Sequence, residues 1–173
     1  LSYADLTAPE NAALDKQITF TPLISEWLGG FSYIHNVGSK IFLKTNYEAP
    51  RSKVIALDLT KPEMANWEQV LPQHEKNVLQ YADCLNGMLL ANYLQDAADK
   101  LSIYDFASPA NLLKEIKLPD IGSVVGVAGR WDSAEMFYKF SSFADPGSSY
   151  RVDLTNFSDE RLAVTKLAEG SPD

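Results

Sequence analysis

The chain has 173 residues, of which 46% are hydrophobic and 22% are charged, and its net charge is −8. This length and composition predict a folded domain with a sizeable core and exclude an intrinsically disordered chain. No apolar run reaches the ~18 residues of a membrane span, and the acidic balance argues against binding to nucleic acid.

The N-terminal segment, residues 1–22, predicts part of a β-sheet. Residues 1–6 have the composition of a strand, and residues 7–16 form a polar connection that contains Pro9. Gln17–Pro22 alternates polar and apolar residues, as a half-buried outer strand does. The chain starts in the middle of a strand and without Met, which suggests that it begins inside something larger.

Residues 23–72 and 73–119 each predict a unit of four strands. In the first unit the strands are Phe31–Asn36, Ile41–Thr45, Val54–Leu59 and Trp67–Leu71, and Pro72 ends the last one. In the second unit they are Val78–Leu85, Met88–Leu94, Leu101–Phe106 and Leu112–Leu118. The dipeptide Asn86-Gly87 predicts a type I′ turn, in which both residues need a positive φ.

Residues 120–168 predict a third unit of the same kind. Its strands are expected at Gly122–Gly129, Met136–Phe140, Tyr150–Leu154 and Leu162–Leu167, with turns at Trp131–Ser133 and Asp145–Gly147. The polar tail, residues 169–173, is expected to leave the domain. Little helix is expected. Residues 61–67 and 73–77 could each make one turn, but neither segment has the sustained 3.6-residue apolar period of a longer helix.

A repeat unites these segments. The third strand of each unit ends in an aspartate followed by an apolar residue, at Asp5, Asp58, Asp105 and Asp153. The aspartates are 53, 47 and 48 residues apart. A period of about 40 to 50 residues with several strands per period is typical of β-propeller blades. We therefore predict an all-β fold with three complete four-stranded blades and part of a fourth.

Two packing expectations follow from this fold. The first strands of propeller blades converge on the central axis, where small residues such as Gly122, Gly126 and Gly129 fit. Blades pack face to face, so the second strand of each blade is expected to be apolar on both sides, as Met136–Phe140 is.

The residues that carry catalytic chemistry in other proteins do not form a catalytic group here. Ser123 lies inside a predicted strand, whereas a hydrolase serine sits on a strand-to-helix elbow. His35 and His74 are far apart and lack the motifs of a metalloprotease or a zinc site. Cys84 is predicted to be a small core residue, and a single cysteine favours a reducing compartment. We predict no metal site and no cofactor.

Asp58, Asp105 and Asp153 look like a set, but an aspartate at a strand end commonly bonds to its own backbone and starts a turn. No second carboxylate is spaced to pair with any of them for acid–base chemistry. The glycines at 122, 126 and 129 resemble a phosphate loop only loosely, because no helix follows them. Trp131-Asp132 occurs in a hairpin turn rather than at the end of a third strand. All of these residues are therefore predicted to be structural.

Several stretches resemble one enzyme family. Leu118–Gly126, followed by Glu135–Phe143 and Pro146-Gly147, resembles the final propeller blade of prolyl oligopeptidases. The two preceding blades of that family resemble Phe42–Asn46 with Ala49–Arg51, and Trp67–Leu79. The resemblance covers nearly the whole chain in the family's order, and it places the chain in the C-terminal half of the propeller domain.

The resemblance implies a seven-bladed propeller that caps an α/β-hydrolase domain. The parent enzyme would cleave short peptides after proline with a Ser-Asp-His triad that belongs to the hydrolase domain, so no catalytic residue carries over. The chain's partners would be the remaining blades, the hydrolase domain and short proline-containing peptides. In the family, a cysteine that faces the substrate cavity often stands where this chain has Ala4, so Ala4 is expected to line that cavity.

The expected function is therefore the gating and size filtering of peptides in a cytoplasmic prolyl endopeptidase, with no activity in this segment alone. A non-enzymatic propeller that binds other proteins is the alternative. A sugar-processing propeller enzyme is a weaker one, because the predicted inner strands carry few carboxylates. We also expect self-association of the isolated chain, since the terminal blades lack neighbours to cover their apolar faces.

Overall fold

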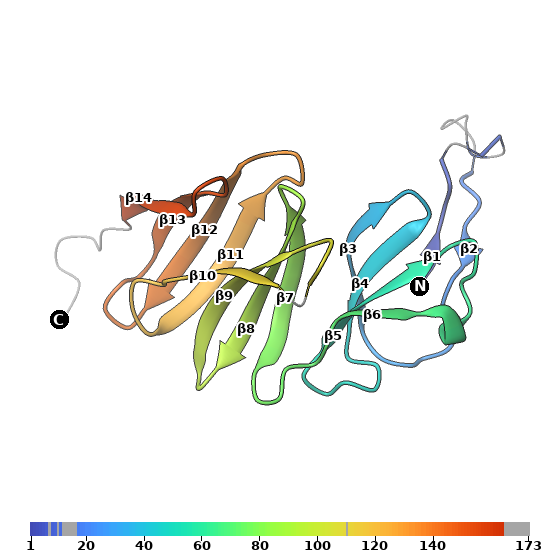
Figure 1. Cartoon of the computed structure of the whole chain (residues 1–173), viewed down its shortest axis with the longest axis horizontal. Helices are drawn as coiled ribbons and strands as arrows, with labels where there is room; N and C mark the ends of the chain where they lie inside the picture. The colour runs from blue at the N-terminus through green and yellow to red at the C-terminus, as the bar shows by residue number, and fades with distance from the viewer. Residues whose placement is uncertain (7, 10, 12–16, 110, 165–173) are drawn as a thin grey trace.

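The computed structural model describes residues 1–6, 8, 9, 11, 17–109 and 111–164, and within them the fold is all-β apart from one 3-10 turn, η1 (Met64–Asn66). Three four-stranded antiparallel sheets and one two-stranded sheet follow one another along the chain. Figure 1 shows the three large sheets in a row, with the two-stranded sheet beside the first of them. Three complete blades and part of a fourth are thereby confirmed.

Each blade is a meander in which every strand pairs with the next one along the chain. The partial blade contains β1 (Ser2–Tyr3) and β2 (Thr21–Pro22). The first blade contains β3 (Phe31–Val37), β4 (Lys40–Thr45), β5 (Lys53–Asp58) and β6 (Glu68–Leu71). The second contains β7 (Val78–Leu85), β8 (Met88–Gln95), β9 (Ala98–Asp105) and β10 (Leu112–Ile116). The third contains β11 (Gly122–Gly129), β12 (Glu135–Ser142), β13 (Ser148–Asp153) and β14 (Ser158–Val164).

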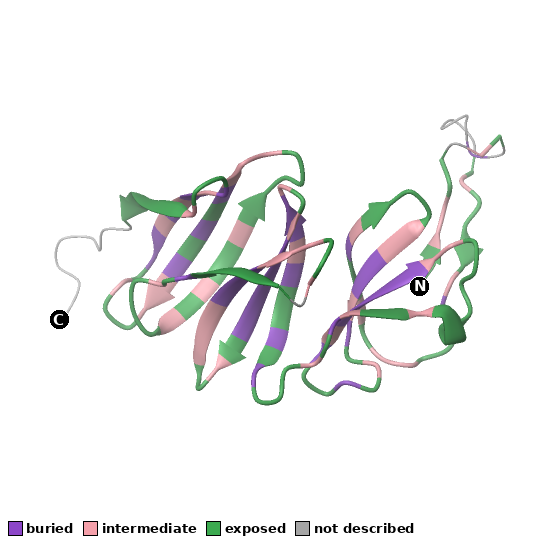
Figure 2. Ribbon diagram, in the orientation of Figure 1, coloured by how far each residue is buried: buried purple, intermediate pink, exposed green. Residues whose placement is uncertain are grey.

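The core lies in the seams between blades, and alternate residues of one strand enter opposite seams. In β8, Leu89 and Ala91 pack into the first seam, between the first and second blades. Leu90, between them, packs into the second seam, against Met136 and Phe140 of the third blade. The middle blade is therefore buried on both faces, as Figure 2 shows along β8 and β9.

The prediction that second strands are apolar on both sides holds only in part for the third blade. Met136, Tyr138 and Phe140 of β12 are buried in the second seam, but Phe137 and Lys139 on its other face are exposed. None of the described sheets covers that face (Figure 2). The alternation of buried and exposed residues along β12 thus shows which face packs against a described blade.

The last strand was expected too late in the chain. β14 is Ser158–Val164 rather than Leu162–Leu167, and residues 165–167 lie outside the described residues. The chain reverses directly after β13, where the Phe157 nitrogen donates a hydrogen bond of 2.7 Å to the Asp153 carbonyl oxygen. Every residue of β14 is exposed, so its polar start carries no apolar alternation that would have revealed it.

The two strands of the partial blade are shorter than expected from residues 1–6 and 17–22. Only Ser2 and Tyr3 pair with Pro22 and Thr21.

The expected crowding of small residues also holds only in part. A Cβ atom added to Gly122 would collide with the Ser141 carbonyl and the Phe140 ring. A Cβ atom added to Gly126 would have no atom of the described residues within 4 Å.

Candidate functional site

A cavity of about 860 Å³ lies between the N-terminal segment and the first blade. Ala4 is half-buried in its wall. The N-terminal side of the lining comes from Leu1, Ser2, Tyr3, Ala4, Asp5, Leu6 and Leu23. The first blade contributes Tyr33, Asn36, Gly38, Ser39, Ile41, Leu43, Leu59 and Thr60.

Asn11 holds the wall that contains Ala4. Its side chain is buried, and its Nδ2 donates to the backbone oxygens of Asp5 (2.9 Å) and Thr19 (3.3 Å). Its Oδ1 accepts a hydrogen bond of 2.8 Å from the Thr19 nitrogen. One amide thereby ties the segment after β1 to the segment before β2, because Asn can donate and accept at once.

Short polar contacts organise the opposite wall. The Tyr33 hydroxyl donates to Asn36 Oδ1 at 2.6 Å. Asp58 Oδ1 accepts from the backbone nitrogen (2.9 Å) and the hydroxyl (2.8 Å) of Thr60. These hydrogen bonds, that of the Thr60 nitrogen first, lower the pKa of Asp58 and keep it ionised.

The lining mixes apolar side chains with hydrogen-bonding groups, and it includes the Asp5 carboxylate. It contains serine and threonine hydroxyls but no histidine, so none of these hydroxyls has a lining imidazole as its base. Such a surface suits the binding of a peptide segment better than covalent chemistry.

The structure does not bring together the residues considered as catalysts. Ser123 is exposed on β11. The His35 ring lies 5.8 Å from that of Trp131 and 6.0 Å from that of Phe106. His74 instead closes the loop before β7, where its Nδ1 accepts from the backbone nitrogens of Lys76 and Asn77, both at 3.0 Å.

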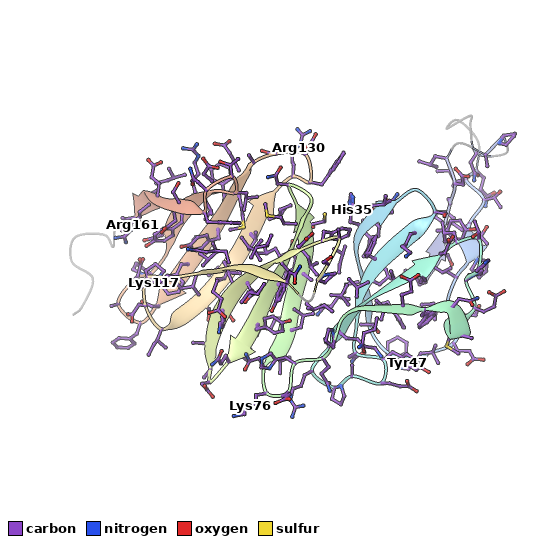
Figure 3. All side chains as sticks on the ribbon, viewed as in Figure 1. His35, Tyr47, Lys76, Lys117, Arg130 and Arg161 are labelled. Atoms are coloured by element: carbon purple, nitrogen blue, oxygen red, sulfur yellow. The ribbon has the colours of Figure 1, made fainter. Side chains whose placement is uncertain are left out.

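Figure 3 shows where His35 lies, on the side of the first blade that faces the second. Arg130, also labelled there, belongs to the β11–β12 hairpin and pairs with Asp132 at 2.8 Å. The hairpin's Trp131 is the ring that His35 meets. Trp131 therefore links the third blade to the first.

Cys84 is buried in the first seam. Burial, with the neighbouring Asp83 carboxylate, raises the pKa of the Cys84 thiol to about 11. A thiolate is therefore scarce at neutral pH, which agrees with a structural residue rather than a nucleophile.

The repeated aspartates form turns. The carboxylates of Asp58, Asp105 and Asp153 each accept a hydrogen bond from the backbone nitrogen two residues later, at 2.9, 2.9 and 2.8 Å. This Asx geometry is the local structural role expected for an aspartate at a strand end.

In the described residues, no group of three or more His, Cys, Asp or Glu side chains is placed to hold a metal ion. No helix in the same part of the chain is long and apolar enough to cross a membrane.

One half-buried lysine, Lys44, was not singled out from the sequence. The Lys44 ammonium crosses the first seam and donates to the backbone oxygens of Gln80 (2.7 Å) and Leu79 (3.5 Å). Burial lowers the pKa of Lys44. The sequence signal for this contact was a lysine among apolar residues of a strand. Only the packed blades show which backbone carbonyl groups the ammonium reaches.

Comparison with known proteins decides the family. The sequence model of the family of prolyl oligopeptidase N-terminal β-propeller domains matches residues 1–165. The chain belongs to the prolyl oligopeptidase family. The family resemblance found in the sequence is thereby confirmed.

Two relatives illustrate the match. A dual-function macrocyclase-peptidase of Galerina marginata is 29% identical over 162 residues, which cover 90% of this chain and 21% of the relative. A prolyl endopeptidase of Elizabethkingia miricola is 23% identical over 154 residues, which cover 89% of this chain and 21% of that enzyme. The chain thus spans about a fifth of the length of these relatives.

Two solved structures also match the fold of this chain. The apo form of prolyl oligopeptidase B from Galerina marginata superimposes with a TM-score of 0.81 at 25% identity, over 97% of this chain and 23% of that one. The same enzyme bound to a 25-residue macrocyclization substrate gives a TM-score of 0.78 at 28% identity, over 88% and 21% of the two chains.

Proposed function

We propose that this chain forms part of the propeller of a cytoplasmic serine peptidase that cleaves short peptides after proline. The propeller's role is steric, because it limits which peptides reach the active site. The match of residues 1–165 to the family's propeller domain carries this proposal. The remaining blades and the hydrolase domain with its triad would lie in the rest of the polypeptide, since the relatives are more than four times as long as this chain.

The packing of the blades gives the filter its physical basis. A filter by size requires walls that do not part when a large peptide presses on them. Fully buried side chains, such as Leu89 in the first seam and Met136 in the second, join neighbouring blades. The Lys44 ammonium adds a charged hydrogen bond across the first seam.

Ala4 is proposed to face the bound peptide. Its place in the wall of the 860 Å³ cavity supports this role, since the surrounding lining mixes apolar side chains with hydrogen-bonding groups. A methyl side chain offers contact area but no reactive group, so Ala4 would contribute shape rather than chemistry.

The test uses the polypeptide that carries this chain. Cleavage is measured for a short proline peptide and for a much longer one with the same residues around the proline. The wild type is expected to prefer the short peptide, and Lys44→Ala is expected to narrow that preference severalfold by loosening the first seam. Lys100→Ala is the matched control, because Lys100 pairs with Glu115 inside the second blade rather than across a seam.

Equal cleavage of both peptides by the wild type would contradict size filtering. No cleavage of either peptide would contradict the enzyme itself, and the protein-binding propeller would then replace it.

A further inference from the structure

The three blades place equivalent residues at one position of their second strands. The second and third strands pair in the same register, with Lys40 opposite Asp58, Met88 opposite Asp105 and Glu135 opposite Asp153. Four residues further along each second strand stand Lys44, Asn92 and Lys139. All three positions lie on the face that looks toward the next blade, because the face is set by alternation along the strand.

In the first seam a lysine fills this position. The Lys44 ammonium donates to the backbone oxygens of Leu79 and Gln80 in β7, the first strand of the second blade. Gln80 is the extra residue of a β-bulge, since the pairing of β7 with β8 shifts between Leu79 and Tyr81. The bulge turns carbonyl groups out of the ladder, where the ammonium meets them.

In the second seam the same position holds the shorter Asn92. The facing strand β11 has its bulge in the same register, with Val125 as the extra residue between Val124 and Gly126. A cavity of about 370 Å³ lies here, lined by Gln80, Tyr81, Asn92, Val124, Val125, Gly126 and Val127. The cavity thus occupies the place that corresponds to a lysine side chain in the first seam.

The groups around this cavity favour a cationic hydrogen-bond donor. Asn92 is 5% exposed, and no described residue donates a hydrogen bond to its Oδ1. Two carboxylates bond to residues that line the cavity: Asp99 accepts from the Val124 nitrogen at 2.7 Å, and Asp83 accepts from the Tyr81 hydroxyl at 2.6 Å. A buried acceptor without a donor is costly, and the acidic neighbours attract positive charge.

We propose that the second seam binds a primary alkylammonium group, the chemistry of a lysine side chain, in the cavity beside Asn92. The ammonium bonds to Asn92 Oδ1 and to the backbone oxygens of the β11 bulge, as the Lys44 ammonium does to those of β7. The alkyl chain lies against Val125 and Val127. If the proposed function holds, on which this step rests, such a site at the first strands of two blades would meet peptides that enter the propeller.

The experiment is saturation-transfer NMR with n-butylammonium on the polypeptide that carries this chain. Saturable transfer is expected for n-butylammonium, while n-butanol, which has the same chain without the charge, should bind much more weakly. This readout does not depend on peptidase activity, so its failure is distinct from the failure of the proposed function.

Two substitutions locate the site. Asn92→Lys places a tethered ammonium in the cavity and is expected to abolish the transfer to n-butylammonium. Lys44→Asn recreates the Asn92 arrangement in the first seam and is expected to add a second site. If Asn92→Lys fails to fold, Asn92→Leu serves instead, because it removes the acceptor and is expected to weaken binding several-fold.

Binding that survives in Asn92→Lys or, where that variant does not fold, binding of unchanged affinity in Asn92→Leu would overturn the proposal. Equal binding of n-butanol would also overturn it, since the cavity would then be merely apolar, as would the absence of saturable transfer to n-butylammonium.

Discussion

Two hairpins of the second blade turn through residues with positive φ. Asn86 and Gly87 have φ values of 49° and 69°, which confirms the type I′ turn predicted from their sequence. Asp96 and Ala97, in the next hairpin, have nearly the same values, 48° and 64°. An alanine in this conformation is strained, because its Cβ approaches the following carbonyl oxygen.

Ala97→Gly is therefore expected to stabilise the chain by about 1 kcal/mol. Ala97 is exposed, so the substitution removes no core contact. The free energy of unfolding in urea is the measurement. Ala98→Gly is the control, because Ala98 lies in β9, where glycine is expected to destabilise by about 0.5–1 kcal/mol. A loss of stability in Ala97→Gly would contradict the argument.

Asp153 makes the stability of the third blade depend on pH. Hydrogen bonds from the hydroxyl and the backbone nitrogen of Thr155 lower the pKa of its carboxyl group below the ordinary value. A lowered pKa in the folded state stabilises the fold above the unfolded-state pKa of about 3.9, and this contribution is lost as the pH falls through the folded value.

Asp153→Asn keeps an acceptor oxygen but removes the titration. The wild type is expected to be the more stable of the two at neutral pH, and the difference is expected to shrink below about pH 4. Urea unfolding of both proteins at the two pH values measures it. A difference that does not change with pH would show that the charge has no part in the turn.

At the scale of the element, β12 and β13 contain a stacked pair of tyrosines. The rings of Tyr138 and Tyr150 lie 4.9 Å apart and nearly parallel, at 9°. No described residue forms a hydrogen bond with the buried Tyr138 hydroxyl, and burial raises the pKa of this group. The ring is favourable in the second seam, whereas the hydroxyl is costly there.

Tyr138→Phe should keep the stack and remove the unpaired hydroxyl. We expect stabilisation by about 1 kcal/mol, read from thermal or urea unfolding. Tyr150→Phe is the matched control in the same stack, and it should change stability less. Destabilisation by Tyr138→Phe would mean that the hydroxyl has a favourable partner after all.

For the whole molecule, the two ends of the row of blades differ. The outer face of the third blade exposes Phe137 and Lys139 beside the pair of Arg151 with Glu135, whose closest atoms are 2.7 Å apart. The opposite end carries the 860 Å³ cavity between the partial blade and the first blade. Neither end is buried as the middle blade is.

The isolated chain is therefore expected to self-associate at micromolar concentration. Association should increase with salt, because the net charge of −8 repels like copies and salt screens that repulsion. Light scattering at low and high ionic strength measures it. Phe137→Asp should reduce association, while Trp27→Ser, an exposed aromatic outside the blades' strands, should not. A monomer under both conditions would contradict the prediction.

The isolated chain is also expected to cleave no proline peptide. Among the described residues, Ser123, His35 and His74 lie on separate elements and do not form a triad. Detectable cleavage by the pure chain would contradict this view of its function.

Most of the fold was predictable because its signals are local. The Asp-apolar repeat, the Asn86-Gly87 turn and the alternating strands depend on neighbours within a few residues, and the structure confirms them. The start of β14 was missed because an exposed edge strand needs no apolar pattern. Ala4 is the one lining residue of the candidate cavity singled out from the sequence, through the family resemblance, and its contact with a peptide stays a prediction. The first-blade residues of the lining reach the cavity only through folding.

The sequence was sufficient for the blades, the family and the absence of a recognisable triad motif. Only the packed structure shows that Lys44 bonds across one seam while Asn92 leaves a cavity in the next. The physical reason is the range of the interactions. Hairpins and Asx turns are decided by backbone geometry within one blade, whereas a seam is decided by which side chain meets which carbonyl of a strand about 35 residues away.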